Sequence, residues 1–183
     1  MPVLHIYPQP ELPAIFKWRA IAFMRTEWSD IFHGDNLYMS ETYPPSYQPV
    51  HFVVVEGETL ITYAAILEVT LDHCGHSYQI YGFGNMFTFA PFRKQGYGSQ
   101  VLESATEYIK TSPVDASILF CDPNLESFYE TQGWQATRSP TRLGKPDRYK
   151  VYNPTRMMLF ISGKGHFGKS DFESQPMYID WPW

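Results

Sequence analysis

Hydrophobic and polar positions along the chain follow helical patterns in some segments and strand patterns in others. Apolar residues recur at three- and four-residue steps from about 11 to 31 and from about 98 to 110, which predicts two amphipathic helices. A shorter helix is predicted over 124–132, because Gly133 follows it as a C-cap. Alternating or continuous apolar runs predict strands at 3–7, 51–56, 60–70, 78–89, 116–120, 149–152 and 157–161.

The segments between these elements carry turn and loop residues. Residues 33–49 are predicted to form a loop, because Gly34-Asp35-Asn36 and a later pair of prolines interrupt any regular pattern. Gly57 and the polar run 72–76 each predict a hairpin turn between strands. The tail from 163 to 183 shows no periodicity, and we expect it to be irregular.

The order of the predicted elements is strand, helix, several antiparallel strands, helix, strand, helix and further strands. This order predicts an α/β fold with a mixed sheet. A chain of 183 residues can bury roughly 70% of the surface that its unfolded form exposes, so it needs no disulfide. Its 44% of hydrophobic residues favour a packed core. We therefore expect a single domain over residues 1–183.

The two cysteines, Cys74 and Cys121, and the start of the chain bear on its compartment. The first residues contain no basic stretch followed by an apolar one, so no secretory signal is visible. Without export a lone disulfide is not expected, and the sequence predicts a cytoplasmic protein with free thiols. No apolar run approaches the ~18 residues of a membrane span, so no membrane partner is expected.

The formal net charge of -5 argues against a nucleic-acid partner. Binding to phosphates requires a surplus of Lys and Arg on one face of a protein. A negative charge is compatible with a cationic substrate, but it equally serves solubility. The charge alone therefore selects no function.

A glycine-rich segment, residues 89–100, lies between a predicted strand and a predicted helix. Gly96 and Gly98 let the backbone approach a ligand without a Cβ clash. The first amides of the following helix have no acceptor within it and lie at the positive end of its dipole. A pyrophosphate can accept hydrogen bonds from several such amides, and Arg93 and Lys94 add positive charge. The segment therefore predicts a phosphate-binding loop.

The spacing within this loop distinguishes between kinds of phosphate site. It lacks the Gly-x-x-x-x-Gly-Lys-Ser/Thr pattern of nucleotide-hydrolysing P-loops and the complete Gly-x-Gly-x-x-Gly of dinucleotide sites. Its pattern is Arg-x-x-Gly-x-Gly, formed by Arg93, Gly96 and Gly98. This pattern resembles the acetyl-CoA signature of the GNAT superfamily of N-acetyltransferases.

A second motif stands further along the chain, after the predicted helix and a buried strand. Phe128 and Tyr129, followed by Gly133 and Trp134, are similar to the aromatic pair that precedes Gly-Phe or Gly-Trp in GNAT proteins. The resemblance is specific from about 52 to 134. It implies a mixed, mostly antiparallel central sheet flanked by helices, with a splayed strand at the acetyl-CoA site.

The resemblance also implies which residues hold acetyl-CoA. In GNAT proteins free backbone groups of the splayed strand pair with the pantetheine arm; by position these belong to Met86, Phe87 and Thr88. The pyrophosphate is held by amides of the loop, here Arg93, Lys94, Gln95, Gly96, Tyr97, Gly98 and Ser99. Asn124 corresponds to a further pantetheine contact, although Asp122 stands nearer the family's usual spacing.

Tyr129 resembles the family's general acid, which protonates the departing thiolate of CoA. A phenol with a pKa of about 10 can supply that proton when it lies within hydrogen-bond reach. The alternative is that Tyr129 packs in the core. The general base stays open, because the stretch 81–85 offers no carboxylate where many relatives carry a glutamate. Glu68, His76 or an ordered water remain as candidates.

The end of the chain, Asp180-Trp181-Pro182-Trp183, is loosely similar to aminoglycoside 2'-N-acetyltransferases. In those enzymes acidic side chains and the C-terminal end line a pocket for a polyamine sugar. The resemblance implies that Asp35, Glu41, Asp180 and Trp183 bind the acceptor, the carboxylates by attracting ammonium groups. An ordinary surface tail is the alternative.

Taken together, these patterns predict an acetyl-CoA-dependent N-acetyltransferase for a primary amine of a small molecule. The amine attacks the thioester directly. The alternative is a GNAT-fold module that binds acyl-CoA without turnover. The cluster 72–76 gathers Asp, His and Cys, yet no second cluster completes a zinc site, so no metal is expected. A monomer or a homodimer is compatible with the sequence.

Overall fold

The computed structural model describes all 183 residues, from Met1 to Trp183. The helices are α1 (Ala14–Glu27), α2 (Tyr97–Lys110), α3 (Glu126–Glu130) and α4 (Gly163–Ser174). The first five strands are β1 (Val3–Pro8), β2 (Val50–Glu56), β3 (Thr59–His73), β4 (His76–Thr88) and β5 (Ala116–Cys121). The others are β6 (Gln135–Thr137), β7 (Thr141–Lys145), β8 (Arg148–Tyr152), β9 (Thr155–Phe160) and β10 (Met177–Ile179).

The strands form two sheets. Seven strands follow the order β1-β2-β3-β4-β5-β9-β6, and three more follow the order β10-β7-β8. β4 and β5 are parallel, while the pairs β1–β2, β2–β3, β5–β9 and β6–β9 are antiparallel. A strand that returns parallel to its neighbour needs a crossover, and α2 supplies it. The expected mixed, mostly antiparallel sheet is confirmed.

The chain divides into two compact units. The first comprises Met1–Leu67 and Asn85–Ala105, and the second comprises Glu68–Gly84 and Thr106–Trp183. β3, β4 and α2 each contribute residues to both units. That the whole of residues 1–183 forms one acetyltransferase domain stays a prediction.

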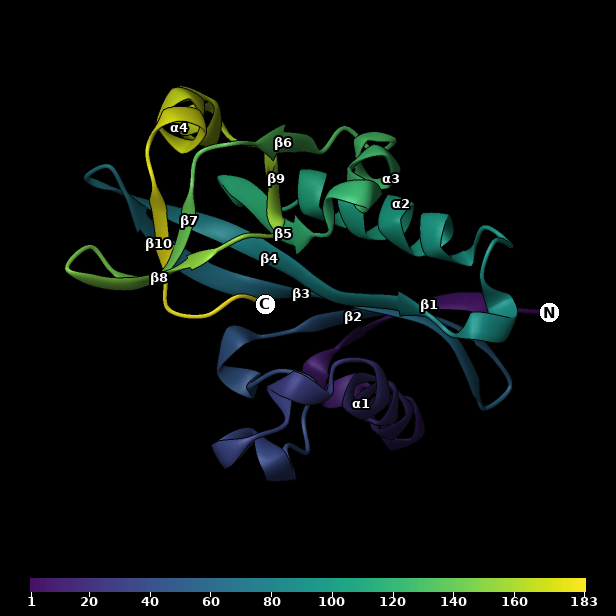
Figure 1. Cartoon of the computed structure of the whole chain (residues 1–183). Helices are drawn as coiled ribbons and strands as arrows, with labels where there is room; N and C mark the ends of the chain where they lie inside the picture. Colours follow the sequence, from purple (N-terminus) through teal and green to yellow (C-terminus); the bar gives the residue numbers. More distant parts are fainter. The chain divides into compact units, whose positions relative to one another are not determined.

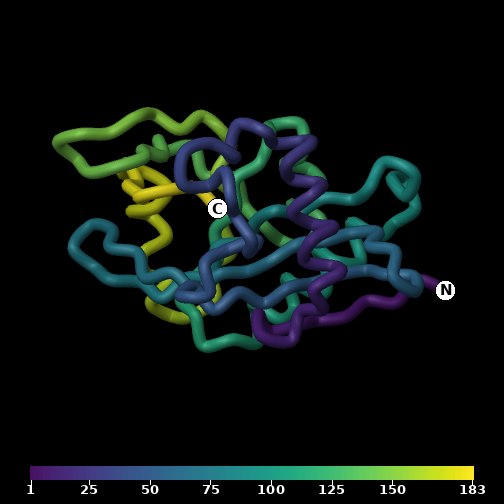
Figure 2. The backbone as a smooth tube through the Cα atoms, turned by 90° about the horizontal axis from the view of Figure 1, so that it is seen from below, coloured from purple at the N-terminus to yellow at the C-terminus, as the bar shows by residue number.

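In the first unit, α1 crosses the strands β2 and β3 (Figure 2). Its inner face carries Phe16, Ala20, Ile21, Phe23 and Met24, all of them buried. These side chains recur at three- and four-residue steps, so they meet one side of the sheet. Phe23 stacks on Phe87 of β4 with ring centroids 3.9 Å apart. β2 is buried on both faces over residues 51–55.

In the second unit, α4 lies against the strands (Figure 1). Its glycines and Phe172 make the contacts. A Cβ on Gly165 would lie 1.9 Å from the Asp115 carbonyl oxygen, and one on Gly168 would lie 2.2 Å from the Tyr78 hydroxyl oxygen. No other residue type permits an approach this close. Phe172 is fully buried in a cluster with Tyr78 and Phe160.

Two predicted segments are shorter in the structure than the sequence indicated. The first helix begins at Ala14 rather than near residue 11, because a residue that precedes proline is disfavoured from helical angles, and Leu12 before Pro13 is extended. It ends at Glu27, and residues 29–31 form a separate 3₁₀ turn. The predicted turn at 72–76 is confined to Cys74 and Gly75, whose φ angles of 49° and 80° form a two-residue hairpin turn.

The expectation of an irregular tail over 163–183 was wrong. Residues 163–174 form α4 and residues 177–179 form β10. Ser162 caps α4 by accepting a hydrogen bond from the Gly165 amide at 3.0 Å. The sequence did not indicate this helix because it contains three glycines, and glycine has a low helix propensity. The short strands β6 and β7 were missed as well.

Candidate functional site

The loop between β4 and α2 is tied to its own backbone. It begins with a 3₁₀ turn over Ala90–Phe92. The Arg93 Nε donates a hydrogen bond to the Thr88 carbonyl at 2.9 Å. The Gln95 Nε2 donates to the Pro91 carbonyl at 3.0 Å. The side chains of Arg93 and Gln95 therefore shape the loop itself.

The backbone of this loop takes the conformation that an anion cradle needs. Lys94 and Gly96 have φ angles of 62° and 86°, both in the left-handed region. Alternation of left- and right-handed residues turns successive N–H groups toward one side of a chain. The Gln100 amide donates to the Gly96 carbonyl at 3.0 Å, which makes it the first hydrogen bond of α2.

It follows that the amides of Tyr97, Gly98 and Ser99 have no acceptor within the helix. They stand at the positive end of the dipole of a fourteen-residue helix. Gly96 has open space where a Cβ would stand, so its positive φ, and not crowding, is what favours glycine there. That this loop binds a pyrophosphate stays a prediction.

The strand that leads to the loop is irregular near its end. Asn85, near the end of β4, has a φ of 51°, and its Nδ2 donates to the Thr42 carbonyl at 3.4 Å. A left-handed residue departs from the extended backbone of a strand and redirects the chain locally. Phe87 is buried against Phe23, so its side chain belongs to the core. Backbone contacts of Met86, Phe87 and Thr88 with a pantetheine arm stay a prediction.

Tyr129 lies in α3, within the second unit, and is only 7% exposed. Its ring packs edge-on against Phe83 and Phe128. Burial, and then the neighbouring Cys121 thiol, raises the pKa of Tyr129 above its ordinary value. The phenol is therefore protonated at neutral pH. Burial and a raised pKa are found both for a tyrosine that only packs in the core and for one that donates a proton in catalysis. The role of Tyr129 therefore stays a prediction.

The position of α3 depends on contacts that the sequence did not reveal. Glu126, in its first turn, accepts hydrogen bonds from both Nη groups of Arg138, at 2.8 and 2.6 Å, and one from the Thr155 hydroxyl at 2.7 Å. These bonds lower the pKa of Glu126 to about 2, the Arg138 bond most. Burial, followed by Glu126, raises the pKa of Cys121 to about 11, so its thiol is a poor nucleophile.

Asn124 and Asp122 are the two candidates for a pantetheine contact. Both lie at a 3₁₀ turn over Pro123–Leu125 that precedes α3. The Asp122 carboxylate accepts a hydrogen bond from the Asn124 amide at 3.2 Å. Asp122 therefore caps the turn, while the Asn124 side chain is exposed. Their contact with a ligand stays a prediction.

No protein-family model and no curated protein sequence matches the chain. Solved structures match it closely in fold. Escherichia coli ElaA aligns at 16% identity over 86% of this chain and 99% of its own, with a TM-score of 0.62. Arabidopsis thaliana NAA60, solved with a bisubstrate analogue, aligns at 13% identity over 88% of this chain and 99% of its own, with a TM-score of 0.59.

A third structure is the GNAT family N-acetyltransferase YhbS from Escherichia coli in complex with CoA. It aligns at 13% identity over 97% of this chain and 89% of its own, with a TM-score of 0.58. The chain has the GNAT fold. At these identities the likeness concerns the fold alone, and the similarity to aminoglycoside 2'-N-acetyltransferases is not among these matches.

Within this GNAT fold, the expected acceptor residues have different surroundings. Asp35 is exposed in a 3₁₀ turn over Gly34–Tyr38. The Glu41 carboxylate is already engaged, because it accepts hydrogen bonds from Lys17 Nζ at 2.5 Å and Gln9 Nε2 at 2.6 Å. Its charge is compensated by Lys17. Glu41 is thus less suited to attract an ammonium group than the sequence suggested.

Trp183 is anchored within the second unit. Its indole N–H donates to the Ile118 carbonyl of β5 at 3.0 Å. A Cβ on Gly82 of β4 would lie 2.6 Å from the indole ring. The ring also contacts Phe120, with centroids 5.5 Å apart. The last residue therefore covers two adjacent strands of the GNAT sheet, while Asp180 is exposed.

A buried histidine in the first unit is the main polar feature that sequence reasoning missed. His51 of β2 is fully buried, and its Nε2 hydrogen-bonds Gln9 Oε1 at 2.6 Å. Its Nδ1 lies 2.8 Å from the Tyr63 hydroxyl, which in turn lies 2.9 Å from the Thr42 hydroxyl. Burial lowers the pKa of His51 to about 4. A histidine inside a strand pattern gave no signal of this chain of hydrogen bonds.

Neither sequence candidate for the general base is identified by its surroundings, since Glu68 and His76 are both exposed. No group of three or more His, Cys, Asp and Glu side chains is arranged to hold a metal ion. None of the helices has the length and apolar character needed to cross a membrane.

Proposed function

We propose that this protein is an acetyl-CoA-dependent N-acetyltransferase that acts on a primary amine of a small molecule. The observation that carries the proposal is the loop at 93–99, whose left-handed Lys94 and Gly96 precede the free amides at the start of α2. The loop follows a strand that contains the left-handed Asn85, in a GNAT fold. A structure of the same fold, YhbS, was solved with CoA.

The reaction needs no acyl-enzyme. The neutral amine attacks the thioester carbonyl, so that a C–N bond forms and the C–S bond breaks. The amine loses one proton to a base, and the departing thiolate takes one from Tyr129, which is protonated at neutral pH. The Cys121 thiol, with its pKa raised to about 11, is unsuited to carry the acetyl group.

The acceptor we favour is cationic, as an aminoglycoside is. Its support is the anchored Trp183, with Asp180 exposed nearby in the sequence, and the net charge of -5. Deleting residues 181–183 should raise the KM for such an acceptor and leave acetyl-CoA binding nearly unchanged. Asp180→Asn should act in the same direction, and added salt should weaken acceptor binding in the parent by screening. An unchanged acceptor KM after truncation would remove the support for this acceptor class.

A module that binds acyl-CoA without turnover is the second candidate. The observation that favours it is the stretch 81–85 of β4, which carries no carboxylate to serve as a base. Both candidates predict acetyl-CoA binding, and only the enzyme predicts steady release of free CoA. A thiol assay with a panel of amines, aminoglycosides and polyamines first, separates them.

Binding is tested by thermal shift. A ligand that binds only the folded state raises stability by RT ln(1 + [L]/Kd). Gly96→Asp puts negative charge at the proposed pyrophosphate site and should abolish the shift with acetyl-CoA. Gly57→Asp is the matched control, since Gly57 also has a positive φ and open space around its Cα, but lies in the β2–β3 turn. Equal shifts in both variants would contradict the loop assignment.

Catalysis is tested at Tyr129. Tyr129→Phe removes only the hydroxyl and should slow turnover by about 10²–10⁴-fold while acetyl-CoA affinity is kept. Tyr78→Phe is the control, because the Tyr78 hydroxyl is buried without a hydrogen-bond partner. Turnover that is equal in the two variants would assign Tyr129 to the core.

A further inference from the structure

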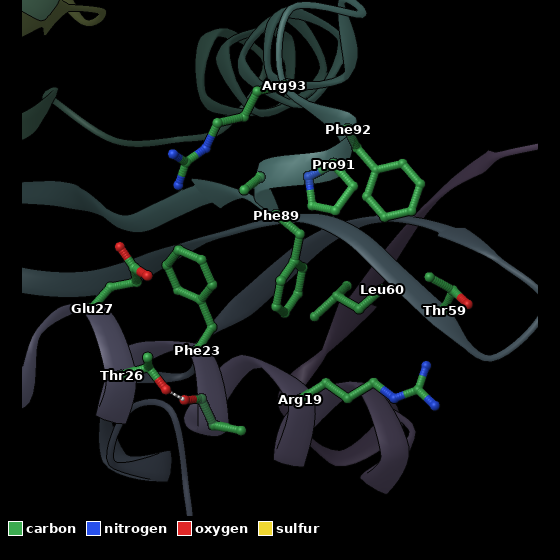
Figure 3. A pocket seen from close by; sticks show the side chains of 12 residues that line it. Arg19, Phe23, Thr26, Glu27, Thr59, Leu60, Phe89, Pro91, Phe92 and Arg93 are labelled. Atoms are coloured by element: carbon green, nitrogen blue, oxygen red, sulfur yellow. Dashed lines mark hydrogen bonds between the residues drawn. The ribbon is translucent and has the colours of Figure 1, made fainter.

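The first unit contains a pocket of about 570 Å³. It is lined by a stripe of α1, by the start of β3 and by residues 89–93, which directly follow β4. Phe23, Leu60, Phe89, Pro91 and Phe92 form apolar walls (Figure 3). This volume falls within the range of small-molecule sites, which are apolar with a few placed polar groups.

Charged groups stand at both ends of this pocket. Figure 3 draws the ends of Arg93 and Glu27 at one end, beside Phe23, and the guanidinium of Arg19 at the other. One cation and one anion therefore flank the same aromatic wall. A ligand that offers an anion and a cation on neighbouring atoms matches this pair.

These charged groups form no ion pairs within the protein. Arg93 donates through Nε to the Thr88 carbonyl, and its two Nη groups have no partner in the chain. Arg19 and Glu27 form no hydrogen bond or ion pair. Lys17, on the same helix, is paired with Glu41 at 2.5 Å. A cation and an anion without partners beside an aromatic wall contribute little to the stability of the fold, but they are available to bind a charged ligand.

We propose that this pocket binds a free α-amino acid with an aromatic side chain. Its carboxylate would bind the Nη groups of Arg93, and its ammonium group would bind Glu27. Its ring would pack against Phe23 and Phe89, where offset or edge-on contacts between aromatic rings are favourable. The Arg93 side chain lines this pocket, whereas its backbone belongs to the loop proposed for the pyrophosphate, so binding of the amino acid is measured without acetyl-CoA.

The probe for this site is L-phenylalanine, measured by isothermal titration calorimetry on the full chain. Two analogues each lack one charged group: 3-phenylpropionate has no ammonium, and phenethylamine has no carboxylate. Each charge-assisted contact that is lost should weaken binding by about tenfold. Binding of all three probes with equal affinity would overturn the proposed recognition of both charges.

Two variants test the location. Ala22→Trp fills the pocket from an exposed position of α1 and should abolish binding of L-phenylalanine. Glu27→Gln should remove the preference for L-phenylalanine over 3-phenylpropionate and leave affinity for the latter unchanged. Circular dichroism checks that both variants fold. Ala14→Trp, at an exposed position of α1 that does not line the pocket, is the matched control and should bind as the parent does. No saturable binding by the parent, or full binding by a folded Ala22→Trp variant, would overturn the proposal.

Discussion

A buried basic side chain in each unit, His51 in the first and Arg156 in the second, shows two different outcomes for a buried charge. His51 in the first unit and Arg156 in the second are 0% and 1% exposed, and neither contacts a carboxylate. Burial lowers the pKa of His51 to about 4 and that of Arg156 to about 10. At neutral pH the histidine has therefore lost its charge, whereas the arginine keeps it.

The arginine must then satisfy every donor with neutral acceptors. Its Nε and Nη1 donate to the hydroxyls of Thr137 and Thr141, at 2.7 and 3.2 Å. Its Nη2 donates to the Ser139 hydroxyl at 2.5 Å and to the Phe172 carbonyl at 2.6 Å. These bonds join β9 to β6, β7 and α4. Arg156 stays protonated and therefore needs hydrogen bonds to several elements, whereas His51 becomes neutral and needs fewer.

The largest effect is expected from Arg156→Met. It removes the charge but leaves the hydroxyls of Thr137, Ser139 and Thr141 without their donor, so the free energy of unfolding should fall by about 3 kcal/mol or more. Hydrogen exchange should show the loss in β6, β7 and α4. His51→Gln retains a donor and an acceptor at this position and should cost less. An equal loss of unfolding free energy in the two variants would contradict the difference drawn between the two buried groups.

The next effect is the pH dependence of the first unit. The pKa of His51 is about 6.5 in the unfolded chain and about 4 in the folded one. The unfolded state binds the proton first, so this stability is complete above pH 6.5 and is lost as the pH falls to 4. The loss amounts to about 3 kcal/mol, and urea titrations across that range should show it.

His51→Gln should remove this pH dependence. His73 in the second unit is the internal reference, because burial lowers its pKa as well. His73→Gln should therefore remove a separate and smaller part of the loss. The pKa of Arg156 lies far above this range, so Arg156 contributes no slope. A slope that survives the loss of both histidines would locate the titrating group elsewhere.

The smallest effect is expected from Gly82→Ala, which tests the contact between β4 and Trp183 in the second unit. The new Cβ would lie 2.6 Å from the Trp183 indole, so the ring must leave the Ile118 carbonyl. Since the Trp183 side chain is only partly buried, the cost should be about 1 kcal/mol. Fluorescence should report a more exposed tryptophan. An unchanged spectrum would mean that strand movement, and not the tail, absorbs the extra atom.

The sequence predicted what local rules decide. The apolar period located α1 and α2, and Gly96 marked the turn into α2 because its backbone demands a left-handed residue. The Arg156 cluster and the His51 chain were beyond its reach. Both join residues far apart in the chain, and the hydroxyls that satisfy Arg156 look like ordinary loop and strand residues. The motif around Tyr129 made it a candidate, but the motif did not predict that its side chain is buried.

The glycines of α4 have a consequence for how the protein acquires its structure. A helix with Gly163, Gly165 and Gly168 has little tendency to form alone, and its stability comes from contact with Tyr78 and the Asp115 carbonyl. Tyr78 lies in β4 and Asp115 directly precedes β5, and these two strands must pair beforehand. α4 is therefore a late element of folding, and a peptide of residues 163–174 should be unstructured in water. Its formation reports that the strands beneath it have been assembled.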